Sequence, residues 1–314
     1  MIDVVEKPCF KPEDFSPAGK KPGITAILRL RNEQDYLEQA FNSIRPFFDE
    51  FVVVYNQCSD RTPALVEQFV RQEPYRTRAF HYVPEVFPQG SERHAALPAH
   101  HVSSLVHYSN FAYSKASYRI CIVWDGDMIA APGPLGNIVN RLRSIKPRTL
   151  TWWRSPWKHG WWWFSGVNLW DHEGKIFVPK TRLRVSGRRD HGFWPVARGT
   201  VYRHDARFEV LNIRWLLPTF IGFAYFHVKG MKKDRGVGVY QLEKNPCSIF
   251  NRVKLDPSRT NPELMTFEEY CRMEPGARSL PNPEDLSIWP IRKTTKIEAT
   301  RRALRTDPCQ ARGQ

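Results

Sequence analysis

A short apolar segment that ends in two carboxylates constrains this chain more than any other feature. Residues 119–124 predict a buried strand, and Asp125, Gly126 and Asp127 follow it directly. Alternate residues of an extended chain point the same way, so the two carboxylates can face one point in space. Two carboxylates suit a hard divalent cation, Mg²⁺ or Mn²⁺, which completes its shell with substrate phosphates. Gly126 leaves room for a ligand to approach the backbone.

An ordinary acidic turn also fits this tripeptide, so the preceding segments decide between the two interpretations. Apolar segments predict strands at 24–30, 51–55 and 79–83, and helical spacing of apolar residues follows the first two. Residues 102–117 predict a helix just before the strand that leads to Asp125. This alternation predicts an α/β fold with a mostly parallel sheet and helices on both faces.

Polar loops follow three of the predicted strands. Asn32, Asn56 and Asp125 each stand just after a strand, at the edge of a parallel sheet where ligands bind. Arg29 and Arg31 lie at the end of the first strand, where they fit either a phosphate contact or a solvated surface. Three separate loops therefore converge on one predicted binding edge.

Changes in composition and residue pattern divide the chain into four parts. We expect an irregular leader at 1–22, a half with alternating strands and helices at 23–150, an aromatic-rich half of the same domain at 151–275, and a basic tail at 276–314. Seven tryptophans lie within 151–170, and helix periodicity is hard to find in that half. Aromatic rings of this kind stack on sugars, enter a membrane interface or simply pack a core.

Composition limits the partners and the compartment. With 47 Lys and Arg against 32 Asp and Glu, the net charge of +15 favours anionic partners: nucleotide phosphates, an anionic glycan, a membrane surface or nucleic acid. The six cysteines are scattered without zinc or disulfide spacing, which favours a reducing cytoplasm. We expect neither a signal peptide nor a spanning segment, and the basic stretch at 292–305 suggests peripheral contact with the inner membrane surface.

Three motifs together resemble a known family. Arg31-Asn32-Glu33 after the first strand, the polar turn at 56–62 and Asp125-Gly126-Asp127 are similar to the nucleotide-sugar glycosyltransferases of the GT-A fold, closest to the family-2-like group. Tyr55 stands where that family commonly has an acid before its turn. The resemblance covers about 24–145 and extends more loosely to about 235. It implies a single Rossmann-like nucleotide-binding domain joined to an irregular, aromatic-rich acceptor half.

The resemblance also implies roles for individual residues. His227 lies near the end of the apolar segment 215–228 and would complete the metal site, unless it is a buried histidine bonded to a carbonyl. Lys229, Lys232 and Lys233 follow it and would lie near the diphosphate. Gly166 would belong to a loop beside donor sugar and acceptor. The metal ligands would be Asp125, Asp127 and His227, and the donor-binding residues Arg29, Asn32, Glu33, Asn56, Asp60, Asp125 and Gly166.

The catalytic base is less well marked. Asp190 and His191 stand in a polar segment of the second half that also fits an ordinary ion-paired turn. We place them ahead of Asp171, Asp205 and Glu209 as the group that deprotonates the acceptor.

We therefore expect a hexosyltransferase that uses Mn²⁺ or Mg²⁺ and moves a sugar from a nucleotide sugar, with inversion. The acceptor would be a glycan or a lipid-linked precursor of a surface polysaccharide or lipopolysaccharide. A sugar nucleotidyltransferase is the first alternative, although residues 29–33 hold no glycine for a phosphate loop. A basic module that binds single-stranded nucleic acid is the second.

Overall fold

The computed structural model describes residues 1–88, 91–144, 161–172, 175–179, 185–205, 208–213, 218–232, 264–266 and 269. Its helices are α1 (Leu37–Ile44), α2 (Thr62–Gln72), α3 (Glu92–Ala95), α4 (Leu105–Ser114) and α5 (Pro132–Ser144), with a short 3-10 helix at Pro12–Phe15. Its strands are β1 (Ile2–Val5), β2 (Lys21–Leu30), β3 (Glu50–Asn56), β4 (Thr77–Tyr82), β5 (Tyr118–Val123), β6 (Met128–Ala130), β7 (Trp161–His172), β8 (Lys175–Pro179), β9 (Val185–Pro195), β10 (Tyr202–Asp205), β11 (Phe208–Leu211), β12 (Pro218–Gly230) and β13 (Leu264–Thr266).

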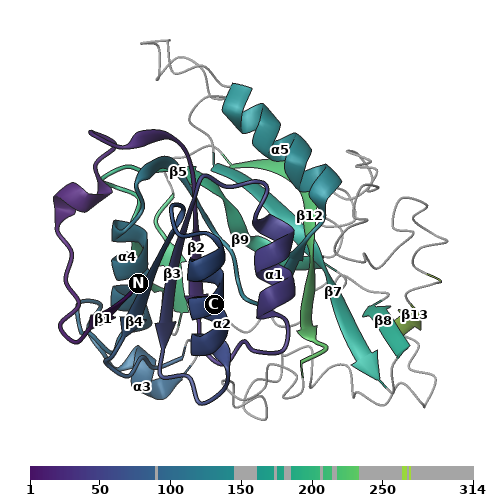
Figure 1. Cartoon of the computed structure of the whole chain (residues 1–314), viewed down its shortest axis with the longest axis horizontal. Coiled ribbons are helices and arrows are strands. Elements are labelled where there is room, and N and C mark those ends of the chain that lie inside the picture. Colours follow the sequence, from purple (N-terminus) through teal and green to yellow (C-terminus); the bar gives the residue numbers. More distant parts are fainter. Residues whose placement is uncertain are drawn as a thin grey trace, which may run out of the picture.

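One large sheet organises the described part of the chain (Figure 1). Its strands run in the order β1-β4-β3-β2-β5-β9-β7-β12-β6, while β8 and β13 extend it beside β7 and β10 pairs with β11. The first five strands are parallel to one another, and β7 is parallel to β12. Pairs β5–β9, β9–β7 and β12–β6 are antiparallel. The expected α/β fold with a mostly parallel sheet is confirmed.

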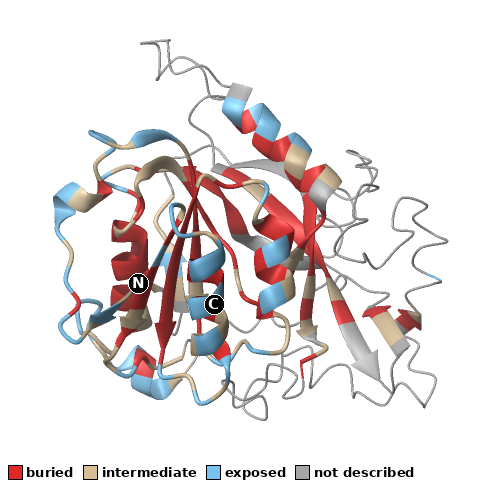
Figure 2. Ribbon diagram, viewed as in Figure 1, coloured by how far each residue is buried: buried red, intermediate tan, exposed pale blue. Residues whose placement is uncertain are grey.

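Two apolar cores cover the two faces of the sheet. One core joins α1, α2 and α5 to the sheet through residues such as Phe41, Phe69 and Leu135. The other joins α4 through Val106 and Phe111. Figure 2 shows buried residues along the sheet, beside exposed ones on α1 and α5, and along nearly the whole of α4. Because both faces are covered, β3 is buried along its whole length, as its unbroken apolar sequence predicts.

Two segments are more regular than the sequence suggested. The leader at 1–22 contains β1, which pairs in parallel with β4, and the short 3-10 helix. An edge strand is held mainly by backbone hydrogen bonds, so its sequence shows only a weak alternation of apolar and polar residues. The second half contributes the long strands β7, β9 and β12. Aromatic residues such as Trp162, Phe164 and Phe193 are buried there. Strands that are buried on both faces lack the alternation of apolar and polar residues by which a strand is recognised in a sequence.

Some expectations lie outside the described residues. These include Trp152, Trp153 and Trp157 of the tryptophan block and the basic stretch at 292–305. The side chains of Asp171, Asp190 and Asp205 also lie outside them, although their backbones belong to β7, β9 and β10. None of the helices in the ranges given above is long and apolar enough to span a bilayer.

Candidate functional site

The strand order places a topological switch point between β2 and β5. From β2 the chain moves through α1 to β3 and through α2 to β4, and it then returns past α4 to β5 on the other side of β2. Where the winding direction reverses, the loops after the two neighbouring strands separate and leave a binding crevice at their carboxyl ends. The loop after β2 carries Asn32 and Glu33, and the loop after β5 carries Asp125 and Asp127. The predicted motif therefore lies at the switch point.

A tight turn brings the two loops together. The amide of Met128 donates to the carbonyl of Asp125 at 3.1 Å, which closes the turn between β5 and β6. A Cβ on Gly126 would lie 2.9 Å from the Cβ of Glu33, closer than such atoms approach. Glycine is therefore needed for the turn to pack against Glu33. The amide of Val228 donates to the carbonyl of Asp127 at 2.9 Å, so β12 is fixed beside the same turn.

Asp127 is the buried centre of the cluster, with 5% of its surface exposed. Its Oδ1 lies 3.2 Å from His227 Nε2, and its Oδ2 lies 2.9 Å from Lys232 Nζ. Burial alone would raise the pKa of Asp127, but the charges of His227 and Lys232 hold it well below its usual range. Asp127 is therefore ionised and already bonded on both oxygens.

Lys232 also binds Glu33. Its Nζ lies 2.6 Å from Glu33 Oε2, so one ammonium joins the loop after β2 to the turn after β5. Burial, and then the charge of Asp127, raise the pKa of Glu33 to about 8 against the opposing effect of Lys232. Burial lowers the pKa of Lys232, but the two carboxylates outweigh it and raise that pKa. Asp127, Glu33, Lys232 and His227 are called the charged cluster below.

Histidines line both sides of the turn. His227 Nδ1 lies 3.0 Å from Asn168 Oδ1 of the neighbouring strand β7, which orients the ring. On the other side, His191 Nε2 of β9 lies 3.8 Å from Asp125 Oδ2. The side chain of Asp125 is 35% exposed, whereas that of His191 is 10% exposed. Asp125 is thus the carboxylate of the pair that a ligand reaches first.

The geometry fits a cation that takes part of its shell from a ligand. Two octahedral ligands, each about 2.1 Å from an ion, lie about 3 Å apart, close to the spacing of Asp127 Oδ1 and His227 Nε2. In the part of the chain that the structure describes, no three His, Cys, Asp or Glu side chains gather to form a complete metal site. Asp127 and His227 would therefore hold an ion together with phosphate oxygens or water, with Asp125 nearby.

The other predicted donor residues hold the loops in place. Asn32, with φ of 55°, accepts from the amide of Ser59 at 2.8 Å. Asp60 accepts from the amides of Thr62 at 2.9 Å and Gln34 at 3.0 Å. Together these bonds tie the loop after β2 to the loop after β3.

Asn56 is 2% exposed and bonds the backbone of the loop after β4. It donates to the carbonyls of Tyr82 at 2.8 Å and Pro84 at 2.6 Å, and it accepts from the amide of Val86 at 3.2 Å. Asn32, Asn56 and Asp60 are called the loop corner below.

Arg29 and Gly166 lie elsewhere than the sequence suggested. Arg29 donates to Glu209 Oε1 at 3.0 Å and to Ser109, and its guanidinium lies over the ring of Tyr202, on the α4 face. Gly166 lies inside β7 and not in a loop, and a Cβ there would be 2.4 Å from the ring of Tyr225. The glycine is needed because that ring fills the space beside it.

Sequence reasoning missed three parts of the site. It placed Lys232 near a diphosphate but did not pair it with Glu33, and it did not identify Asn168 or the buried pair of Arg29 and Glu209. Contacts between distant segments leave no local pattern. The position of Asn168 beside His227 depends on the parallel register of β7 and β12.

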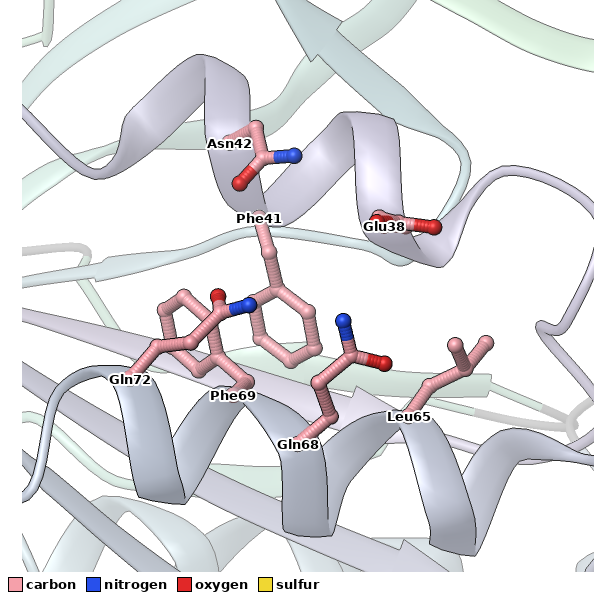
Figure 3. A pocket seen from close by; sticks show the side chains of 7 residues that line it. All are labelled: Glu38, Phe41, Asn42, Leu65, Gln68, Phe69 and Gln72. Atoms are coloured by element: carbon pink, nitrogen blue, oxygen red, sulfur yellow. The ribbon is translucent and has the colours of Figure 1, made fainter.

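A shallow cavity also lies between α1 and α2, away from the charged cluster (Figure 3). Its volume is about 10 Å³, which is room for about one water molecule. It is lined by Glu38, Phe41, Asn42, Leu65, Gln68, Phe69 and Gln72.

No protein family model matches the chain, and no curated protein matches it. Among solved structures it is similar to TarS 1–349 of S. aureus, with 13% identity, a TM-score of 0.38, and 66% of this chain and 60% of that chain covered. It is also similar to the mannosyltransferase PcManGT of Pyrobaculum calidifontis in complex with GDP-Man and Mn²⁺. There the identity is 19% and the TM-score 0.30, with 43% of this chain and 35% of that chain covered.

A third similar structure is glucosyl-3-phosphoglycerate synthase of Mycobacterium tuberculosis in complex with Mg²⁺ and UDP. The identity is 19% and the TM-score 0.27, with 45% of this chain and 47% of that chain covered. The chain spans less than two thirds of each of these three structures. At these TM-scores the likeness carries no functional argument, so the function is argued from the site itself.

Proposed function

We propose that this protein is a glycosyltransferase that uses a nucleotide sugar and a divalent cation. One observation carries the proposal: Asp127 and His227 meet at 3.2 Å beside the switch point between β2 and β5. A crevice at the switch point of a wound sheet suits a nucleotide, and this pair suits a cation that also takes diphosphate oxygens.

Asp127 and His227 would hold the cation, with Asp125 at the exposed side of the turn. When bound, the cation supplies Lewis-acid stabilisation of the leaving nucleoside diphosphate. Asn168 orients His227, and the turn around Gly126 fixes Asp127 against Glu33. These contacts keep the ligand atoms in place before the donor arrives.

His191 is the base that we propose for the acceptor. Its Nε2 lies on the Asp125 side of the turn, at 3.8 Å from that carboxylate. The acceptor oxygen would bond to the anomeric carbon while its proton passes to His191 and the sugar–phosphate bond breaks with its electron pair on the diphosphate. This direct displacement inverts the anomeric centre. Asp190, its neighbour in β9, is the second candidate for the same role.

The acceptor and the location form the outer part of the proposal. We propose a glycan or lipid-linked acceptor at the inner membrane surface, supported by the net charge of +15 and the basic stretch at 292–305. A chain truncated after Pro290 should lose binding to acidic vesicles and keep transfer to a short soluble acceptor. Equal vesicle binding by the two chains would remove the membrane part.

The activity itself can be tested with a panel of nucleotide sugars. Each would be incubated with the full chain and Mn²⁺ or Mg²⁺, with hydrolysis and thermal stabilisation as readouts. We expect one donor to be hydrolysed and to raise the melting temperature only when the cation is present. Hydrolysis that is equally fast in excess chelator would contradict the role of the cation. Cleavage of a nucleoside triphosphate with a sugar phosphate would instead indicate a nucleotidyltransferase.

A further inference from the structure

Lys232 has an environment that lysines seldom occupy. Its side chain is 7% exposed, and its ammonium lies 2.6 Å from Glu33 and 2.9 Å from Asp127. A buried charge is costly unless it is paired, and here one ammonium lies between two buried carboxyl groups, of which Asp127 is ionised. The two carboxylates come from the loops on the two sides of the crevice. Lys232 therefore fills the place between these loops with a compact positive charge.

The two oxygens of Asp127 have different partners. Oδ1 faces His227 Nε2, while Oδ2 binds Lys232. A divalent cation held by Oδ1 and His227 would share this one carboxylate with the ammonium. Two cations on one carboxylate repel each other, and the repulsion is strong where water is excluded. Binding of the cation and bonding of Lys232 to Asp127 therefore oppose each other.

We propose that Lys232 is a tethered competitor of the divalent cation at Asp127. This inference rests on the proposed function. It holds that the chain binds the free cation weakly, and that a nucleoside diphosphate strengthens that binding because its phosphates accept the displaced ammonium. Cation and nucleotide would then each raise the affinity for the other, since coupling between two sites is reciprocal.

The segment around Lys232 is built for such a change. The amide of Met231 donates to the carbonyl of Val228 at 2.8 Å, and the hydroxyl of Tyr36 donates to the carbonyl of Met231 at 3.3 Å. The backbone before Lys232 is thus anchored at the end of β12. Its long side chain can move by rotation about its own bonds while the backbone stays in place.

Calorimetric titration of the full chain with MnCl₂ alone, without nucleotide, tests the proposal. Lys232→Met keeps an unbranched side chain and removes the ammonium. We expect it to bind Mn²⁺ about tenfold to a hundredfold more tightly than wild type, the worth of a bond between charged groups. Lys115→Met is the matched control. It removes the same charge from the end of α4, where Lys115 lies over the ring of Phe111, and should leave the Mn²⁺ affinity unchanged.

A second pair of variants guards against misfolding, because Lys232→Met leaves two buried carboxyl groups without their shared ammonium. Glu33→Gln removes one of them, so the comparison is repeated between Glu33→Gln and the double variant Glu33→Gln/Lys232→Met. The double variant should again bind Mn²⁺ at least about tenfold more tightly. Equal affinity within both pairs, or weaker binding without the lysine, would overturn the proposal.

The result separates this inference from the proposed function. Tighter Mn²⁺ binding without turnover of any nucleotide sugar would support the competition and reject the glycosyltransferase. Donor turnover with unchanged Mn²⁺ affinity would do the reverse. Adding UDP or GDP provides the second readout: either nucleotide should strengthen Mn²⁺ binding more in wild type than in Lys232→Met. An equal gain in both would also count against the competition.

Discussion

The charged cluster and the loop corner lie at the same edge of the sheet, yet they differ in how their polar atoms are used. In the loop corner, Asn56 and Asp60 bond backbone groups of neighbouring loops. In the charged cluster, the carboxylate of Asp127 bonds the side chains of His227 and Lys232, which carry or can gain a positive charge. Backbone bonds stay the same whether or not a ligand is present, whereas ion pairs can be exchanged for ligand charges. The difference separates residues that build the crevice from residues that act in it.

The largest contrast is expected between two substitutions of aspartate. Asp127→Asn removes the charge that the cation and His227 require, and it should lower turnover by about a thousandfold. Asp60→Asn weakens bonds to two backbone amides and should cost about 1 kcal/mol of stability, with turnover within about tenfold of wild type. Steady-state kinetics and denaturant unfolding of both variants measure the contrast. Similar losses of turnover in the two would erase the distinction between cluster and corner.

His191 gives the next largest effect. His191→Asn cannot accept the acceptor proton, so turnover should fall by about a hundredfold with donor binding little changed. A base must be unprotonated to act, so wild-type activity should rise with pH up to the pKa of the base, and the variant should lose this rise. Asp190→Asn is the comparison. If Asp190→Asn alone removes the rise, the base is Asp190 and His191 only supports the site.

Much of the crevice could be predicted because its residues follow strands. Periodicity located β2, β3 and β5, and the loops after them carry Asn32, Asn56 and Asp125. The long apolar segment ending in His227 also indicated a strand, and the structure places this histidine beside Asp127. The sequence does not reveal which face of the strand end a side chain takes. Arg29 therefore looked like a phosphate ligand, although it points to the α4 face and pairs with Glu209.

The remaining contacts depend on tertiary structure. The bond between Lys232 and Glu33 forms only if the residues after β12 reach the loop after β2. In the sheet, β5, β9 and β7 lie between these two strands. No local pattern contains that placement. Gly166 illustrates the same limit, since its neighbour Tyr225 belongs to another strand and only their register brings them together.

A glycine inside β7 gives a smaller effect, on stability. In Gly166→Ala the new methyl group would meet the ring of Tyr225 at 2.4 Å, and we expect a loss of about 1–3 kcal/mol. Gly136→Ala is the control. Gly136 lies within helix α5, and a methyl group there would be 3.3 Å from the side chain of Phe47. Alanine favours helices, so this variant should be unchanged or up to about 1 kcal/mol more stable. Thermal unfolding of both variants measures the difference. A melting temperature of Gly166→Ala equal to that of wild type would contradict the close packing of Gly166 against Tyr225.

The smallest expected effect is a change in the pH dependence of stability. The pKa of Glu33 is raised from 4.5 to about 8. A carboxyl with a raised pKa binds its proton more tightly in the native state, so its favourable contribution is complete below pH 4.5 and is lost as pH rises toward 8. Glu33→Gln carries no such proton, and its stability should fall less over this window. Denaturant unfolding at several pH values would show parallel curves if Glu33 titrated normally.

The central claim is that Asp127 and His227 hold the cation of a nucleotide-dependent reaction. The most direct test is a crystal of the full chain grown with MnCl₂ and a nucleoside diphosphate, with anomalous scattering recorded for manganese. The account predicts one peak about 2.0–2.3 Å from Asp127 Oδ1 and His227 Nε2, with phosphate oxygens completing its shell. A nucleotide bound in the crevice with the peak beside Arg29 and Glu209 or at the loop corner, and none between Asp127 and His227, would contradict the claim.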